Sequence, residues 1–254
     1  MPAPSPLLQN ALTRVLTKGG LHLDYQPLVQ ISDGATAGLE ALCRWTDPTL
    51  GVVPTETFIS HSENSGEIVQ LGHQVLVLLK NDFVKLLVKF PAIRISTNAS
   101  ATELNAPNFA ENFTFWLHTL PTHAAQHLTL EVTETSLTQL SEVAIAYLHT
   151  LREIGIQIAI DDFGKGQSSL SRLHTLPFDI IKLDKSFTRQ LDQPMVHEIV
   201  RWVVAFGQRF GKKVTAEGVE SQSQYDLLRT LGFDYAQGFL LGRPAPLAHW
   251  LALP

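Results

Sequence analysis

Cysteine is almost absent from this 254-residue chain, which contains Cys43 alone. One cysteine excludes a framework of disulfides within the chain. No apolar run reaches the ~18 residues that a helix needs to cross a membrane, and residues 1–6 lack the basic and apolar segments of a signal peptide. These absences predict a cytoplasmic protein whose chain makes no contact with a membrane.

Positive charge is also scarce, since 19 Lys and Arg stand against 24 Asp and Glu, which gives a formal net charge of −5. A broad basic surface for nucleic acid is therefore not expected, although a few local cations could hold a small anionic substrate. Hydrophobic residues make up 44% of the chain, enough for one large core. No linker or low-complexity segment interrupts the sequence, so we expect one domain over residues 1–254.

Short apolar segments alternate along the chain with segments of helical periodicity. Strands are predicted at residues 21–26, 35–45, 92–98, 127–133, 156–161, 179–184, 213–218 and 235–239. The turn signal at 32–34 predicts an antiparallel hairpin for the first two. Strands that alternate with helices indicate a parallel sheet, and eight of them over this length indicate a closed (β/α)8 barrel. Periodicity alone leaves an open, doubly wound sheet as the alternative.

Two adjacent acids, Asp161 and Asp162, end the fifth predicted strand. Each carboxylate loses water at the end of a buried strand, and each raises the free energy of ionising the other. A positive group must offset this charge, and a divalent metal is the simplest candidate. The alternative is an ordinary strand-to-helix turn in which Asp162 or a following serine caps the helix.

Polar side chains stand at the carboxyl ends of most of the predicted strands. They are Glu40, Asn98, Glu131, Asp161, Asp162, Lys182, Glu217 and Gln237. In a barrel these ends meet at one rim, where active sites are built. Each residue taken singly has a structural explanation, such as an ion pair between Glu40 and Arg44, but the set favours a functional site.

The oxygen donors of this set suit Mg²⁺ or Mn²⁺ rather than Zn²⁺, which prefers His and Cys. None of the ten histidines stands at a strand end, so we interpret them as surface or structural residues. Adjacent carboxylates can hold two metals about 3.5–4 Å apart, the arrangement used for phosphodiester cleavage. Lys182 and Arg44 could hold phosphate oxygens.

A series of motifs resembles the EAL domains, which are bacterial cyclic-di-GMP phosphodiesterases. The motifs are Tyr25-Gln26-Pro27, Glu40-Ala41-Leu42-x-Arg44, Asn98-Ala99-Ser100, Glu131-Val132-Thr133-Glu134, Asp161-Asp162-Phe163-Gly164, Ser168-Ser169-Leu170, Lys182-Leu183-Asp184, Ala216-Glu217-Gly218-Val219-Glu220 and Gln237-Gly238. The similarity covers residues 21–245. It implies a barrel whose first strand runs antiparallel to the others, and hydrolysis of cyclic di-GMP to linear pGpG with Mg²⁺ or Mn²⁺. We expect Ca²⁺ to inhibit, because it is larger and tolerates looser coordination.

The resemblance also implies roles for individual residues. One metal would be bound by Glu40, Asn98, Glu131 and Asp161. A second metal would be bound by Asp161 and Asp162, with Glu217 and Glu220 nearby. The catalytic residues would be Lys182, which steers the attacking water, Glu217 as a general base, and Asp162. Substrate contacts would come from Gln26, Leu42, Arg44 and Gln237. Glu134 would anchor the loop after the fifth strand.

The same loop departs from the family pattern. Lys165 stands where a small residue or Thr is usual, and Gln167 stands where an aromatic residue is frequent. Because the loop couples dimerisation to metal binding in the family, these changes bear on rate and regulation more than on the reaction. The resemblance implies a homodimer, formed near the loop and the helix with Phe206 and Phe210. It also implies a sensory or GGDEF domain in a longer parent chain.

Two other functions fit parts of the pattern. The first is a receptor that binds cyclic di-GMP without cleaving it, although such family members lose metal ligands and none is lost here. The second is an enolase-like barrel enzyme with three carboxylates on one Mg²⁺, a chemistry that has no use for Arg44.

Overall fold

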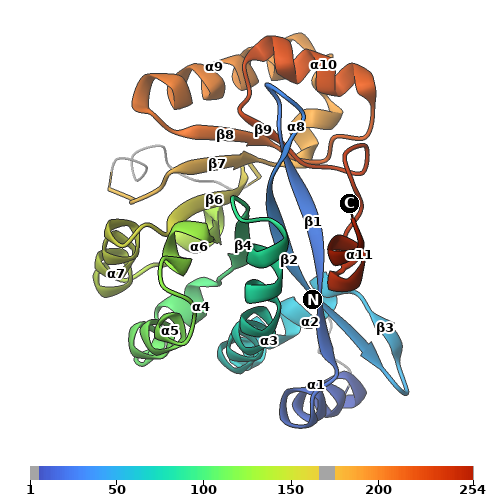
Figure 1. Ribbon diagram of the computed structural model, residues 1–254, viewed down its shortest axis with the longest axis vertical. Helices are drawn as coiled ribbons and strands as arrows, with labels where there is room; N and C mark the ends of the chain where they lie inside the picture. The colour runs from blue at the N-terminus through green and yellow to red at the C-terminus, as the bar shows by residue number, and fades with distance from the viewer. Residues whose placement is uncertain (1–5, 166–174, 254) are drawn as a thin grey trace.

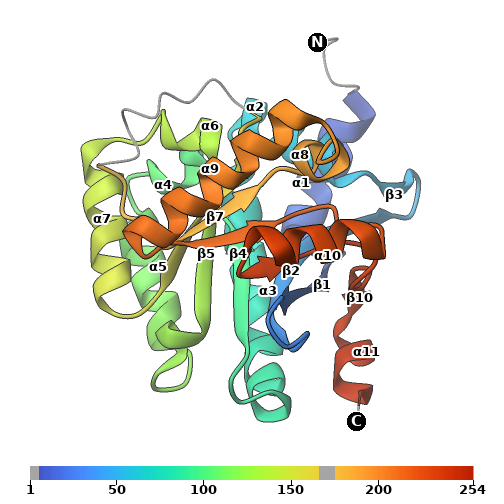
Figure 2. The same ribbon diagram turned by 90° about the horizontal axis from the view of Figure 1, so that it is seen from above.

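The computed structural model describes residues 6–165 and 175–253. Its strands form one sheet that closes into a ring (Figures 1 and 2). The ring consists of β1 (Leu21–Gln30), β2 (Thr36–Asp47), β4 (Arg94–Asn98), β5 (Leu128–Thr133), β6 (Gln157–Phe163), β7 (Ile180–Leu183), β8 (Lys213–Ala216) and β9 (Tyr235–Ala236). Two short strands, β3 (Gly51–Val53) and β10 (Ala245–Pro246), pair with β2 and β1 outside this ring.

The first strand runs against its neighbours. β1 pairs antiparallel with β2 and with β9, whereas β2, β4, β5, β6, β7, β8 and β9 are parallel to one another in that order. The predicted α/β barrel with an antiparallel first strand is therefore confirmed. The pairing of β9 with β1 closes the sheet and excludes the open, doubly wound alternative.

Helices surround the sheet. They are α1 (Pro6–Lys18), α2 (Thr55–Ser65), α3 (Ile68–Lys89), α4 (Ala101–Leu104), α5 (Phe109–His118), α6 (Glu134–Leu137), α7 (Glu142–Glu153), α8 (Lys185–Arg189), α9 (Pro194–Phe210), α10 (Gln222–Leu231) and α11 (Leu247–Ala252), with a 3₁₀ turn at Ala124–His127. In the described part of the chain, none of them is both long and apolar enough to cross a membrane.

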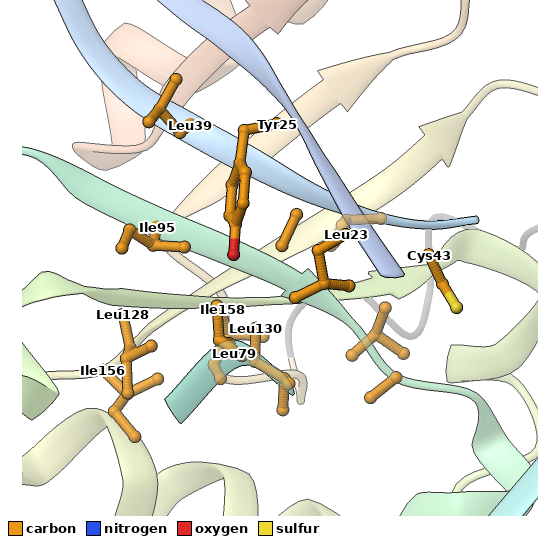
Figure 3. Packing of buried hydrophobic residues seen from close by; sticks show 14 of the residues in the cluster. Leu23, Tyr25, Leu39, Cys43, Leu79, Ile95, Leu128, Leu130, Ile156 and Ile158 are labelled. Atoms are coloured by element: carbon orange, nitrogen blue, oxygen red, sulfur yellow. The ribbon is translucent and has the colours of Figure 1, made fainter. Parts of the chain in front are cut away.

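The core lies between the sheet and these helices. Figure 3 shows Tyr25 of β1, Leu39 of β2, Ile95 of β4 and Leu79 of α3 as members of one buried cluster. Tyr25 is fully buried, and its hydroxyl donates a hydrogen bond of 2.9 Å to Asp82 Oδ2. Burial, followed by the negative charge of Asp82, raises the pKa of Tyr25 above its usual value. This hydrogen bond fixes α3 against β1.

β1 is longer than the sequence predicted, because it continues through Pro27. β10 pairs with Asp24 and Tyr25, and β9 pairs with Val29 and Gln30. Between them, Pro27 pairs with β2 alone among the described strands. A proline has no N–H to donate to a second neighbour, so this one-sided stretch tolerates it.

The short helices α4 and α6 were not predicted, and α5 begins later than the Pro107 signal indicated. α6 follows β5 directly, and α4 follows β4 after Ala99 and Ser100. Each is capped by a side chain: Ser100 Oγ accepts from Glu103 N, and Thr133 Oγ1 accepts from Ser136 N. Most of the helix predicted at 168–176 lies outside the described residues.

Candidate active site

Lys182 lies at the centre of an acidic group at the carboxyl ends of the strands. Its side chain is almost fully buried, and its Nζ is within ion-pair distance of four carboxylates. The distances are 2.5 Å to Glu131 Oε2, 2.9 Å to Glu217 Oε1, 3.1 Å to Asp161 Oδ1 and 3.5 Å to Glu40 Oε2. Residues from β2, β5, β6, β7 and the end of β8 thus meet around one ammonium group.

Glu40 is held from two further directions. Asn98 Nδ2 donates to Glu40 Oε1 at 3.1 Å, and Gln237 Nε2 donates to Glu40 Oε2 at 2.9 Å. Gln26 stands directly opposite Glu40 in the register of β1 and β2. Gln26 and Glu40 lie within β1 and β2 rather than at strand ends, whereas Asn98 is the last residue of β4 and Gln237 follows β9. The structure thus brings Asn98 and Gln237 to Glu40 from separate strands.

A register shift between β6 and β7 sets the positions of Asp161 and Asp162. The pairing of β6 with β7 is interrupted between Ile160 and Phe163, so the two acids occupy a bulge. Asp162 has a φ of 53°, a left-handed conformation that Asp tolerates better than most residues. The bulge lets Asp161 reach Lys182, while Asp162 pairs with Lys165 at 3.2 Å.

Two hollows flank Glu40, which lines both of them. The larger, of about 420 Å³, is also lined by Leu42, Asn98, Asp161 and Asp162. The smaller, of about 240 Å³, is lined by Gln26, Glu217, Glu220 and Gln237, together with Lys185, Arg189 and Phe239. The acidic group therefore opens onto space on both sides.

Negative charge exceeds positive charge at this rim. Burial, and then the neighbouring Glu40, raises the pKa of Glu131 to about 8. Burial also raises the pKa of Glu217 well above its usual value, although Lys182 opposes the shift. Burial alone would lower the pKa of Lys182, but Asp161 and the other carboxylates raise it well above normal. The raised pKa values of Glu131 and Glu217 are thus consistent with four carboxylates that share one ammonium group.

The oxygen donors at this rim are of the chemical type that hard divalent cations prefer. Carboxylate and amide oxygens converge, and Asp161 Oδ1 is buried without a hydrogen bond; it lies 3.1 Å from Lys182 Nζ, but the geometry is not that of a hydrogen bond. Within residues 6–165 and 175–253, no three Asp, Glu, His or Cys side chains are already arranged around one point as ligands. The ammonium group of Lys182 takes the central position among them.

Glu220, Arg44 and Glu134 are among the predicted site residues whose side chains have partners other than Lys182. Glu220 is half exposed and pairs with Arg189 at 3.3 Å, but it lines the smaller hollow beside Glu217. The Arg44 guanidinium lies 3.3 Å from Asp24 and also donates to Thr55 Oγ1. Glu134 Oε2 accepts a 2.8 Å hydrogen bond from Gly164 N, at the start of the loop. Gln167 lies outside the described residues.

Sequence reasoning missed the partner of Arg44. Asp24 faces Leu42 in the register of β1 and β2, and Arg44 faces His22, so Asp24 and Arg44 are diagonal neighbours on the hairpin. Diagonal pairs are within reach of long side chains. The spacing was therefore a usable signal, once the hairpin register was assumed. Lys185, Arg189 and Phe239 were also missed, since they follow the strand ends rather than occupying them.

Together, fold and site define an α/β barrel whose rim gathers four carboxylates around one buried lysine. The sequence model of the EAL domain matches residues 9–244, and the chain belongs to this family. It is 37% identical to the cyclic di-GMP phosphodiesterase NbdA of Pseudomonas aeruginosa, over 95% of this chain and 31% of that protein. It is 36% identical to the cyclic di-GMP phosphodiesterase PdeR of Escherichia coli, over 94% of this chain and 36% of that protein.

A solved structure supports the same assignment. The PaMucR phosphodiesterase in complex with c-di-GMP superposes with a TM-score of 0.84 at 34% identity, covering 96% of this chain and 99% of that one. The chain spans about a third of the length of the two curated relatives named above.

Proposed function

We propose that this chain hydrolyses one phosphodiester bond of cyclic di-GMP and releases linear pGpG, with Mg²⁺ or Mn²⁺ as cofactor. The observation that carries the proposal is the meeting of Glu40, Glu131, Asp161 and Glu217 around Lys182 in a member of the EAL family. Relatives named as cyclic di-GMP phosphodiesterases support the substrate. The prediction of a cytoplasmic location is part of the same proposal.

The residues that would hold a first cation are Glu40, Asn98, Glu131 and Asp161. Those that would hold a second are Asp161, Asp162, Glu217 and Glu220. Bound divalent cations supply Lewis-acid chemistry, which activates water and offsets the charge that develops on the phosphate. Glu220 needs to leave Arg189 to take part, because the two now form an ion pair.

The chain's own polar groups would position the reactants. The Lys182 ammonium group, already held by carboxylates, would donate to the attacking water and orient it. Glu217 lies 2.9 Å from Lys182 Nζ and has a raised pKa, which suits a carboxylate that accepts a proton. Asn98 and Gln237 fix the two oxygens of Glu40.

Substrate would contact Gln26, Leu42, Arg44 and Gln237. Gln26, Gln237 and Leu42 line the two hollows beside Glu40, which supports contacts with the ligand on both sides. Asp24 holds the Arg44 guanidinium, and this pair would present Arg44 to a phosphate oxygen. Glu134 would anchor the loop through Gly164.

We also propose a homodimer formed through α9. Trp202, Phe206 and Phe210 form a ladder of rings 5.8 Å and 4.9 Å apart on this helix. Trp202 is 50% exposed and Phe210 is 62% exposed, so a second copy could cover them. A sensory or GGDEF domain in a longer parent chain agrees with the small share of each curated relative that this chain spans.

Turnover of cyclic di-GMP tests the proposal. Purified protein in Mg²⁺ or Mn²⁺ should produce pGpG, and Glu40→Ala should lower the rate by at least about 100-fold, because the first cation loses a ligand. Glu153→Ala, at an exposed position near the end of α7, should match the wild type. Ca²⁺ should support binding with little turnover, since it tolerates looser coordination.

Intact cyclic di-GMP in both Mg²⁺ and Mn²⁺ would contradict the proposal. If the protein then bound cyclic di-GMP without cleaving it, the receptor function would replace the enzymatic one. Direct binding by calorimetry separates these outcomes.

A further inference from the structure

A groove of about 530 Å³ lies on the outer side of the barrel, between α3 and α5. Figure 1 shows these two helices as neighbours, with the short α4 beside them. The walls are largely apolar, and their aromatic residues are Phe109, Phe113, Phe115 and Trp116. The volume is in the range of pockets that hold small organic molecules.

The walls of the groove are fixed in place. Trp116 Nε1, on α5, donates a 2.7 Å hydrogen bond to Leu76 O on α3. The rings of Phe109 and Phe113 stack with centroids 5.5 Å apart, and Phe113 meets Trp116 at 5.3 Å. Phe115 is left 72% exposed at the side. These contacts hold the two walls together, so a ligand would meet a site that is largely preformed.

A buried carboxylate lies at the floor of this groove. Glu103, on α4, is only 8% exposed. Its Oε2 accepts a 2.9 Å hydrogen bond from Ser100 N. Its Oε1 lies over Gly72 of α3, so closely that a Cβ at that glycine would be 1.6 Å away. Among the described residues, Ser100 supplies the hydrogen bonds to this carboxyl group, through its N–H and its hydroxyl.

His73 and Lys80 line the same groove, but neither forms an ion pair with Glu103 within residues 6–165 and 175–253. Burial raises its pKa to about 7, and the negative charge of Glu63 adds to this shift. Lys80 lies two turns of α3 from Gly72, or about 12 Å along the helix axis. A buried acid without a cation is costly, and an arriving cation would remove that cost.

The helix cap alone does not account for an acid here. Glu103 and Ser100 form a capping box, in which the residue at this position returns one oxygen to the N-cap N–H. Glutamine performs the same role without burying a charge. The second oxygen, over Gly72, is not the one that accepts from the N-cap N–H.

We propose that this groove is a second ligand site, which binds a small organic ammonium ion. The apolar body packs against Phe113 and Trp116, and the ammonium group donates to Glu103 Oε1. Charge complementarity selects this class of ligand: the groove holds a buried carboxyl group that forms no ion pair with a described residue, and its walls offer aromatic faces, which also attract cations. An anion of the same shape would meet Glu103 as a like charge.

The site is connected to the acidic rim. Glu103 and Gly72 also line the larger hollow beside Glu40, and Ala99 alone separates Asn98 from the N-cap Ser100. If the chain has the proposed phosphodiesterase function, an ammonium ion that binds Glu103 would contact the same segment that carries Asn98 of the acidic rim. The binding site itself does not depend on that function.

Calorimetric titration of the whole chain with 2-phenylethylamine, and with the neutral 2-phenylethanol, tests the proposal. The wild type should bind the amine at least about tenfold more tightly than the alcohol, as expected for a charge-assisted hydrogen bond. Glu103→Gln keeps the capping box but should abolish this preference. Phe115→Ala should weaken both probes by roughly threefold, because it removes apolar contact area.

Glu40→Gln is the matched control for binding at the acidic rim, and it should leave the affinity for the amine unchanged. Equal affinity for amine and alcohol in the wild type would overturn the proposal. So would an amine preference that survives in Glu103→Gln or disappears in Glu40→Gln. No arm uses cyclic di-GMP, so failure of the proposed hydrolysis would not affect the result.

Discussion

The ammonium nitrogen of Lys182 lies 2.5 Å from Glu131 Oε2, and both side chains are almost fully buried at the carboxyl ends of β7 and β5. Three more carboxylates lie within 3.5 Å of the same nitrogen. One cation thus compensates four acids in a place with little water. The acidic group can tolerate more positive charge, and it needs Lys182 when no other cation is bound.

Replacing Lys182 by Met should destabilise the metal-free protein by about 3 kcal/mol, because it leaves buried carboxylates without their cation. Added Mn²⁺ should recover much of this loss and should stabilise the variant more than the wild type. Urea unfolding in EDTA and in Mn²⁺ measures both effects. Lys213→Met, which removes the surface pair with Asp234, is the control and should cost less than about 1 kcal/mol.

Equal unfolding midpoints for the wild type and Lys182→Met in EDTA would contradict this electrostatic description. The same holds if Mn²⁺ stabilises the two proteins equally.

Glu134 provides a prediction about the loop after β6. Glu134→Ala removes the acceptor for Gly164 N, so the amide of Gly164 should exchange with solvent roughly tenfold faster, consistent with the loss of about 1.4 kcal/mol. Glu134→Gln retains an oxygen that can accept this hydrogen bond and should remain closer to the wild type. Unchanged exchange of Gly164 in Glu134→Ala would show that this bond does not hold the start of the loop.

Glu103 predicts an unusual dependence of stability on pH. Its folded pKa of about 7 lies above the usual 4.5, so the folded state holds this proton more tightly than the unfolded state does. The contribution of Glu103 to stability is therefore present below pH 4.5 and is lost as the pH rises toward 7. The difference in free energy of unfolding between Glu103→Gln and the wild type should therefore shift by about 2 kcal/mol in favour of the variant between pH 5 and pH 8.

Chemical unfolding of the two proteins at both pH values measures this difference, and groups common to both cancel. A difference that is constant with pH would show that Glu103 ionises normally.

The sequence was sufficient for the barrel and for much of the rim. Eight apolar segments with intervening helices specify a closed sheet, and the rule that strand ends meet explains why Glu40, Glu131, Asp161 and Glu217 converge. These positions can be predicted from a single sequence, because they depend on local pattern and on the order of the strands.

Other features could not be predicted, because they depend on contacts between segments that are distant in the sequence. The bulge at Asp161 and Asp162 arises from the register between β6 and β7. The central position of Lys182 depends on the distances among four other strand ends, and the ion pair of Glu220 with Arg189 depends on how α8 packs. The burial of Glu103 becomes visible only when α4 is placed on Gly72.

Anomalous diffraction from crystals soaked in Mn²⁺ tests the central claim most directly, namely that the acidic rim is a site for hard divalent cations. The prediction is manganese density contacted by Glu40, Asn98, Glu131 and Asp161, at roughly 2.2 Å from their oxygens. Absence of manganese from this rim, with Lys182 still surrounded by the four carboxylates, would contradict it.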